Sequence, residues 1–186
     1  AAPGRPVLQF NRIDFRLPWI KHHFPNAKIV HLYRHPRDQW CSFLTDQQRM
    51  NKDDVHNTYQ DAFYLDVWCR DLAKHYPVLD KINTPHPYQR FYYLWKLSYL
   101  HGLAFSDLSL SFENLTSAPK TVISDMFTAL NMDTNKVEPL VGVIKAPPAE
   151  RWRKYADENW FAQHEYICEQ NLSLMLEERS ITDPER

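Results

Sequence analysis

Glycine is scarce in this sequence. The 186 residues include three glycines, Gly4, Gly102 and Gly142, and none precedes a Lys-Ser or Lys-Thr pair between a strand and a helix. A loop that cradles a phosphate with backbone amides needs glycine, because only glycine lets the main chain approach the anion closely. The sequence therefore contains no glycine-rich phosphate-binding loop.

Cysteine is equally rare. Cys41, Cys69 and Cys168 are odd in number, widely spaced and without a CxxC pair. This pattern argues against a disulfide framework and a thiolate metal site, and it fits a reducing, cytoplasmic compartment. The nine histidines include no HExxH motif, and His22 and His23 are adjacent rather than a helical turn apart. No metal is predicted.

Long apolar runs and an excess of one charge are also missing. No run approaches the ~20 residues that a membrane helix needs, and no signal-peptide pattern occurs. The 22 basic and 23 acidic residues nearly cancel, so no nucleic-acid partner is expected and any anion site must be built locally. The length allows one hydrophobic core, which predicts a single domain over residues 1–186. The start without Met, close to a strand-like run, indicates a partial domain.

Short strands and helices alternate along the chain. Apolar runs predict buried strands over residues 6–11, 27–33 and 108–112. Apolar spacing predicts helices over residues 15–24, 36–50, 58–76, 88–103, 118–130 and 160–178. Strand, helix, strand and helix in succession imply an α/β fold with a parallel sheet.

The segment from Arg34 to Ser42 carries the clearest chemistry. It lies where a predicted strand ends and a helix begins, and ligands of open α/β sheets bind at the carboxyl ends of the strands. The Arg34 guanidinium and the helix N-terminus suit a phosphate, and the Ser42 hydroxyl could bind the same anion. The alternative is a helix-capping segment, with Asp38 in the first turn and Arg34 paired with a surface carboxylate.

The run Phe24–Ser42, FPNAKIVHLYRHPRDQWCS, resembles the 3′-phosphate-binding segment of the sulfotransferase family. In that family a strand ending in Arg-x-Pro-x-Asp precedes a helix carrying Ser, with Arg and Ser eight residues apart, as are Arg34 and Ser42. Three other segments resemble family segments in the same order: PVLQFNRIDFRLPWIKHHFP, LSLSFENLTSAP and ERWRKYADENWFAQHEYICEQNL. Together they cover nearly the whole chain.

The resemblance implies a P-loop-like, three-layer α/β fold whose parallel sheet is flanked by helices. Family members open with a strand and a Gly- and Lys-containing loop that binds the 5′-phosphosulfate of the donor PAPS (3′-phosphoadenosine 5′-phosphosulfate). Neither stands in this sequence, so the fold is expected to be incomplete and the chain to be a fragment that is inactive alone.

The resemblance also implies the reaction, which is sulfuryl transfer from PAPS to a hydroxyl or amine without a metal. The acceptor would be a small molecule, a glycan or a lipid. The alternatives are a noncatalytic remnant or accessory interaction domain with the same fold, and a relative of the P-loop kinases.

The resemblance assigns the donor's 3′-phosphate to Arg34 and Ser42, with Arg151 and Arg153 closing over it. The alternative for Arg151 and Arg153 is a solvated basic face anchored by Trp152. No histidine stands where members carry a catalytic base after the first strand. Arg12 could polarise the donor there, and Asp14 could accept a proton or act as an N-cap for the helix from Phe15.

Overall fold

The computed structural model describes residues 6–44, 51–56, 65–147 and 150–182, and the backbone alone at Phe43 and at 178–182. Within these residues it is a mixed helical protein with a two-stranded parallel sheet, β1 (Val30–Tyr33) and β2 (Leu108–Ser111). Its α-helices are α1 (Leu17–His23), α2 (Pro36–Phe43), α4 (Leu65–Leu72), α5 (Pro87–Phe105), α6 (Phe112–Ser117), α7 (Pro119–Ala129), α8 (Val137–Val141) and α9 (Glu158–Thr182). Its 3₁₀ helices are Asp14–Arg16, Pro77–Leu79, Lys81–Asn83, Thr134–Lys136 and Arg151–Lys154.

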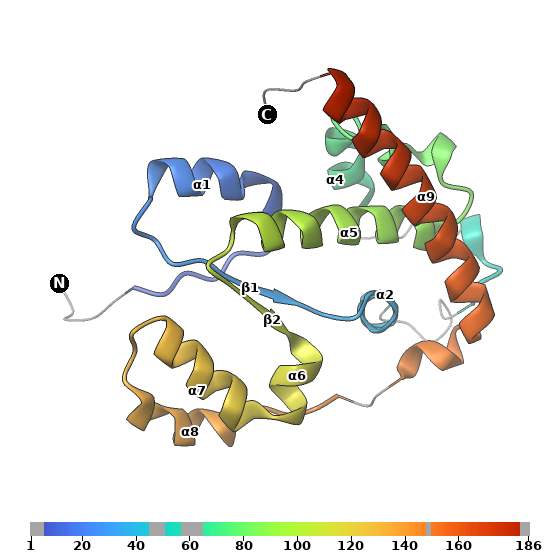
Figure 1. Cartoon of the computed structure of the whole chain (residues 1–186). Helices are drawn as coiled ribbons and strands as arrows, with labels where there is room; N and C mark the ends of the chain where they lie inside the picture. Colours follow the sequence, from blue (N-terminus) through green and yellow to red (C-terminus); the bar gives the residue numbers. More distant parts are fainter. Residues whose placement is uncertain (1–5, 45–50, 57–64, 148–149, 183–186) are drawn as a thin grey trace.

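The sheet separates two groups of helices (Figure 1). Alternate residues of a strand face opposite sides, so His31 and Tyr33 of β1 meet α5 while Val30 and Leu32 face the side of α7 and α8. The main core lies on the α5 side, where Trp40, Tyr88 and Phe161 are fully buried between α2, α5 and α9. A smaller core of Ile123, Phe127 and Val137 joins α7 to α8 on the other side.

Asp107 fixes the start of the sheet. Its carboxylate accepts hydrogen bonds from Lys21 Nζ at 2.6 Å and from the backbone amide of Ile29 at 2.8 Å. The bond from Lys21, helped by that of Ile29, lowers the pKa of Asp107 to about 2. One side chain therefore ties α1, β1 and the beginning of β2 together and sets the pairing of Val30 with Leu108.

Gly102 allows α5 to approach β1. A Cβ at this position would lie 2.3 Å from the His31 ring, much closer than carbon atoms pack. We expect Gly102→Ala to lower the free energy of unfolding by about 1–3 kcal/mol in urea titrations, because His31 must leave its place. Gly142→Ala is the matched control, since its Cβ would meet its nearest neighbour at 3.9 Å. Equal stability of the two variants would contradict the close approach.

Several predicted elements are confirmed and one is wrong. β1, β2, α1, α2, α5, α7 and α9 lie where the patterns predict them, although α2 ends at Phe43 and residues 45–50 are outside the described part. α4 lies within the helix predicted over 58–76, of which 58–64 are also outside it. The buried strand predicted over residues 6–11 is not formed. Val7 and Leu8 are 83% and 73% exposed, and no strand among the described residues pairs with this segment.

Candidate functional site

The change from β1 to α2 occurs within two residues, as the sequence predicts. β1 ends at Tyr33 and α2 begins at Pro36, whose fixed φ suits a first helical turn. The backbone amide of His35 donates to Glu113 Oε1 at 2.9 Å, and the indole Nε1 of Trp95 donates to the Arg34 carbonyl at 3.0 Å. Contacts from α6 and α5 thus hold the turn that carries Arg34.

The Arg34 side chain is half-buried at the carboxyl end of β1. Its guanidinium carbon lies 5.1 Å from the centre of the Phe112 ring. No carboxylate pairs with this guanidinium among the residues that the structure describes. The surface ion pair considered for Arg34 is therefore absent there, and its charge is available at the sheet edge where ligands bind. Ser42 lies on α2 with an exposed side chain.

Arg34 and Arg151 act on the same buried thiol. Burial raises the pKa of Cys41 to about 12, and the positive charges of Arg151 and Arg34 oppose that rise. Both guanidinium groups are therefore within electrostatic range of one point on α2. Arg151 is exposed and has no carboxylate partner in the described part of the chain.

Arg153 is already paired. Its Nε and Nη2 atoms donate to Glu150 at 2.9 and 3.0 Å, and its guanidinium carbon lies 4.3 Å from the centre of the Trp152 ring. Trp152 is 6% exposed. This burial agrees with the alternative in which Arg151 and Arg153 form a solvated basic face and Trp152 packs beneath them. Glu150 has a left-handed backbone with φ of 55° and directly precedes the 3₁₀ helix that begins at Arg151.

Arg37 belongs to the same motif and was not assigned a role from the sequence. Its guanidinium donates to both Glu165 oxygens at 2.8 Å and to Glu158 Oε1 at 2.6 Å, and it is 8% exposed. Glu165 also accepts from the Tyr88 hydroxyl at 2.6 Å. Arg37 therefore connects α2 to Glu158 and Glu165 of α9, and through Glu165 to Tyr88 of α5. These contacts fix the start of α2, directly after the turn that carries Arg34.

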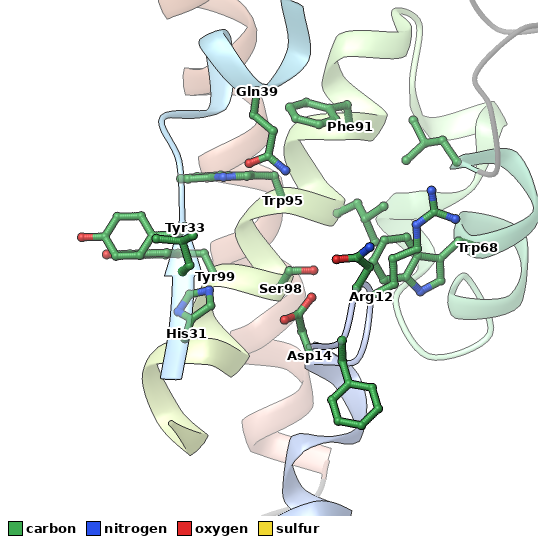
Figure 2. Close-up of a pocket in the computed structure, with 15 residues that line it drawn as sticks. Arg12, Asp14, His31, Tyr33, Gln39, Trp68, Phe91, Trp95, Ser98 and Tyr99 are labelled. Atoms are coloured by element: carbon green, nitrogen blue, oxygen red, sulfur yellow. The ribbon is translucent and has the colours of Figure 1, made fainter. Parts of the chain in front are cut away.

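A cavity of about 350 Å³ lies beside this turn, between the segment before α1, β1 and α5. Figure 2 shows its lining, which includes both catalytic candidates, Arg12 and Asp14. Arg12 has a left-handed backbone with φ of 65°, a strained conformation common at functional sites, and its guanidinium carbon lies 5.6 Å from the centre of the Trp68 ring. Asp14 begins the 3₁₀ helix Asp14–Arg16 and caps nothing, so the N-cap interpretation is wrong.

His31 lines the same cavity. Its Nδ1 lies 3.3 Å from Ser109 Oγ. Burial lowers the pKa of His31, and the negative charge of Asp14 partly opposes this. The imidazole is therefore neutral at neutral pH. His31 is not recognisable as a site residue from the sequence, because a histidine in the middle of a strand gives no indication of a cavity.

The described residues lack two features, a metal-binding cluster and a membrane-spanning helix. Within the described ranges, no group of three or more His, Cys, Asp or Glu side chains is arranged to hold a metal ion. None of the helices in those ranges combines the length and apolar character needed to cross a membrane.

Comparison with known proteins identifies the family. A search of curated proteins and a search of solved structures each found no match. A family model described as the sulfotransferase family matches residues 14–136, which is more than half of the chain and includes Asp14, Arg34 and Ser42. The chain belongs to the sulfotransferase family.

Proposed function

We propose that this chain holds the 3′-phosphate end of PAPS in a sulfotransferase that moves the sulfuryl group to a hydroxyl or amine acceptor. The observation that carries the proposal is the half-buried Arg34 guanidinium, which has no carboxylate partner in the described residues and stands at the carboxyl end of a parallel strand. Arg37, Arg90 and Arg153, in contrast, are all paired with carboxylates. An unpaired guanidinium at this position fits a phosphate, which it can bind with two parallel hydrogen bonds.

In this proposal Arg34 and Ser42 bind the 3′-phosphate of the donor. Arg151 adds a second cation to the same region, and Arg153 closes over the nucleotide if it exchanges Glu150 for the phosphate. Arg12 and Asp14 line the cavity beside this site, where Arg12 polarises the donor and Asp14 accepts the proton of the acceptor. Residues 1–186 form a single domain with part of a three-layer, P-loop-like fold. The described two-stranded sheet and its flanking helices are consistent with that fold.

Sulfuryl transfer depends more on the positioning of donor and acceptor and on electrostatic stabilisation than on a covalent intermediate with the protein. An acceptor oxygen attacks the sulfur in line with the bond to the leaving phosphate, and negative charge grows on the leaving oxygen. Cations fixed near the donor stabilise that charge at little cost in reorganisation. Arg34 is suited to such a role because Trp95 and Glu113 hold its turn in place.

Nucleotide binding tests the proposal. 3′,5′-Diphosphoadenosine should raise the melting temperature of the protein, and adenosine 5′-monophosphate, which lacks the 3′-phosphate, should raise it much less. Arg34→Ala should remove the difference, with a loss of about 10-fold or more in affinity for the diphosphate, because a charged hydrogen-bonded contact is lost.

Arg70→Ala is the matched control, since Arg70 is exposed on α4. Its preference for the 3′-phosphate should equal that of the unchanged protein. Equal temperature shifts with the two nucleotides, or a preference that survives in Arg34→Ala, would argue against the proposal.

A further inference from the structure

Helix α1 has two opposite faces in different environments. Leu17 and Lys21, which are one helical turn apart, face the protein: Leu17 is 4% exposed, and Lys21 Nζ lies 2.6 Å from Asp107 Oδ2. Trp19 and His23 are also one turn apart and face the other way, since a shift of two residues is about half a turn. Trp19 is 57% exposed, and α1 lies at the edge of the molecule (Figure 1).

The outward face of α1 carries an aromatic cluster. The centre of the Trp19 ring lies 4.4 Å from that of His23 and 6.1 Å from that of Phe24. Phe24 follows the last residue of α1 and is 56% exposed. A single exposed apolar side chain is normal on a protein surface, whereas two neighbouring aromatic rings, both more than half exposed, indicate an interaction surface.

The charge around this cluster is positive. No Asp or Glu occurs in the sequence from residue 15 to residue 37. Arg16 precedes α1 and Lys28 follows it, and both are exposed. In the described part of the chain, the carboxylate bonded to residues 15–28 is that of Asp107, which is shared between Lys21 at 2.6 Å and Lys28 at 3.4 Å. A partner of negative charge is therefore favoured.

Aromatic rings flanked by cations are typical of protein segments that lie on a membrane surface. Tryptophan is enriched at the level of the lipid headgroups, and Lys and Arg are attracted to anionic lipids. A nucleic acid fits poorly, because two flanking cations are far fewer than the roughly 6–10 phosphate contacts of nucleic-acid-binding proteins. A protein partner also fits poorly, because a stable protein interface takes about 20–30 residues a side and α1 has seven.

We propose that α1 binds the surface of an anionic lipid membrane, with Trp19 and Phe24 in the headgroup region and Arg16 and Lys28 beside the negative headgroups. The association is peripheral, because the seven residues of α1 are far fewer than the ~20 that a membrane-spanning helix needs. The inference does not rest on the proposed function, since it uses neither Arg34 nor a nucleotide.

Sedimentation with lipid vesicles tests the charge of the partner. The protein should bind vesicles of phosphatidylcholine and phosphatidylserine about 10-fold or more tightly than vesicles of phosphatidylcholine alone, because each Lys or Arg near an anionic surface adds to the affinity. Arg16→Gln/Lys28→Gln should remove most of this preference. Lys136→Gln/Lys145→Gln, which removes two exposed cations elsewhere, is the matched control and should keep it.

The same assay tests the aromatic cluster. Trp19→Ala/Phe24→Ala should weaken binding to the mixed vesicles about 10-fold or more, because the apolar area that enters the headgroup region is lost. Tyr166→Ala/Leu174→Ala is the matched control, since these side chains of α9 are 67% and 60% exposed, and it should bind as the unchanged protein does. Both pairs are exposed, so both variants should keep the melting temperature of the unchanged protein.

Fluorescence quenching locates the contact. Mixed vesicles that contain brominated phosphatidylcholine should quench part of the tryptophan fluorescence, and Trp19→Phe should still bind but lose most of that quenching. Equal binding to the two kinds of vesicle would overturn the inference, as would quenching that is undiminished in Trp19→Phe. Sedimentation with neither kind of vesicle would also overturn it, and is the result expected if the cluster binds an acidic protein instead.

Discussion

Arg37→Met is expected to lower the free energy of unfolding by about 3–5 kcal/mol, because it leaves Glu165 without its cation. The Glu165 carboxylate is 17% exposed, and Arg37 supplies two of its hydrogen bonds. The hydrogen bonds to Glu165 also keep the pKa of Arg37 above its usual range, so the guanidinium stays charged at any moderate pH. Methionine also removes the contacts of the guanidinium with the Trp152 and Phe161 rings, whose centres lie 5.0 and 5.3 Å from its carbon, so the measured loss reports on these contacts as well as on the ion pair.

Urea titrations with two companion variants check this interpretation. Arg153→Met removes an exposed pair with Glu150 and should cost much less stability than Arg37→Met. The double variant Arg37→Met/Glu165→Leu also removes the Glu165 charge and should recover part of the loss, since the carboxylate that remains without its cation, Glu158, is exposed to water. A single Arg37→Met variant as stable as Arg153→Met would show that the ion pair does not hold α2 in place.

Acidification from pH 7 to pH 4 should destabilise the protein through His86. Its Nδ1 accepts from the backbone amide of Tyr88 at 3.0 Å, and its Nε2 donates to the Lys52 carbonyl at 2.8 Å. This pair of contacts requires the neutral ring, because a proton on Nδ1 would face another N–H. Burial, opposed in part by the Lys52 contact, lowers the pKa of His86 to about 4.

The direction of the pH effect follows from that lowered pKa. Between about pH 6.5 and pH 4 the unfolded chain binds a proton at His86 that the folded chain does not, so stability falls as pH falls. The full loss is about 3 kcal/mol, which urea titrations at several pH values would measure. His164, whose ring centre is 5.2 Å away and whose pKa is also lowered by burial, adds to the same trend.

His86→Asn separates the two histidines. Asparagine keeps an acceptor at the N-terminus of α5 but does not titrate, so the dependence on pH should weaken, and the contributions of the other groups whose pKa is lowered, such as His164 and His31, should remain. His75→Asn, at an exposed position, should keep the full dependence. An unchanged pH dependence in His86→Asn would rule out His86 as its source.

Local sequence patterns predict the centre of this fold well. The apolar run before Arg34 and the proline after it are enough to place β1 and α2, because both signals act within a few residues. The helix α6 was missed, since Ser111 ends a strand and also caps the helix by accepting from the amide of Asn114. The residues that cap α6 begin within the predicted strand, so the strand pattern conceals the start of the helix.

Contacts between distant segments are what the sequence does not reveal. An apolar run such as residues 6–11 looks like a buried strand, but burial depends on a neighbouring strand that the run cannot specify. The partners of Arg37 lie 121 and 128 residues away on α9. The cavity that brings Asp14 to His31 likewise joins three separate elements, although Asp14 itself was already a candidate.

The parallel pairing of β1 with β2 has a consequence for how the chain folds. Partners such as His31 and Ser109 are 78 positions apart, so this pairing closes a long loop. The chain loses the conformational entropy of that loop before any contact between the strands forms. High contact order of this kind slows folding, whereas α5 and α9 can gain helix locally. The strands should therefore be late to assemble, and the turn that carries Arg34 should acquire its shape only in the final stage of folding.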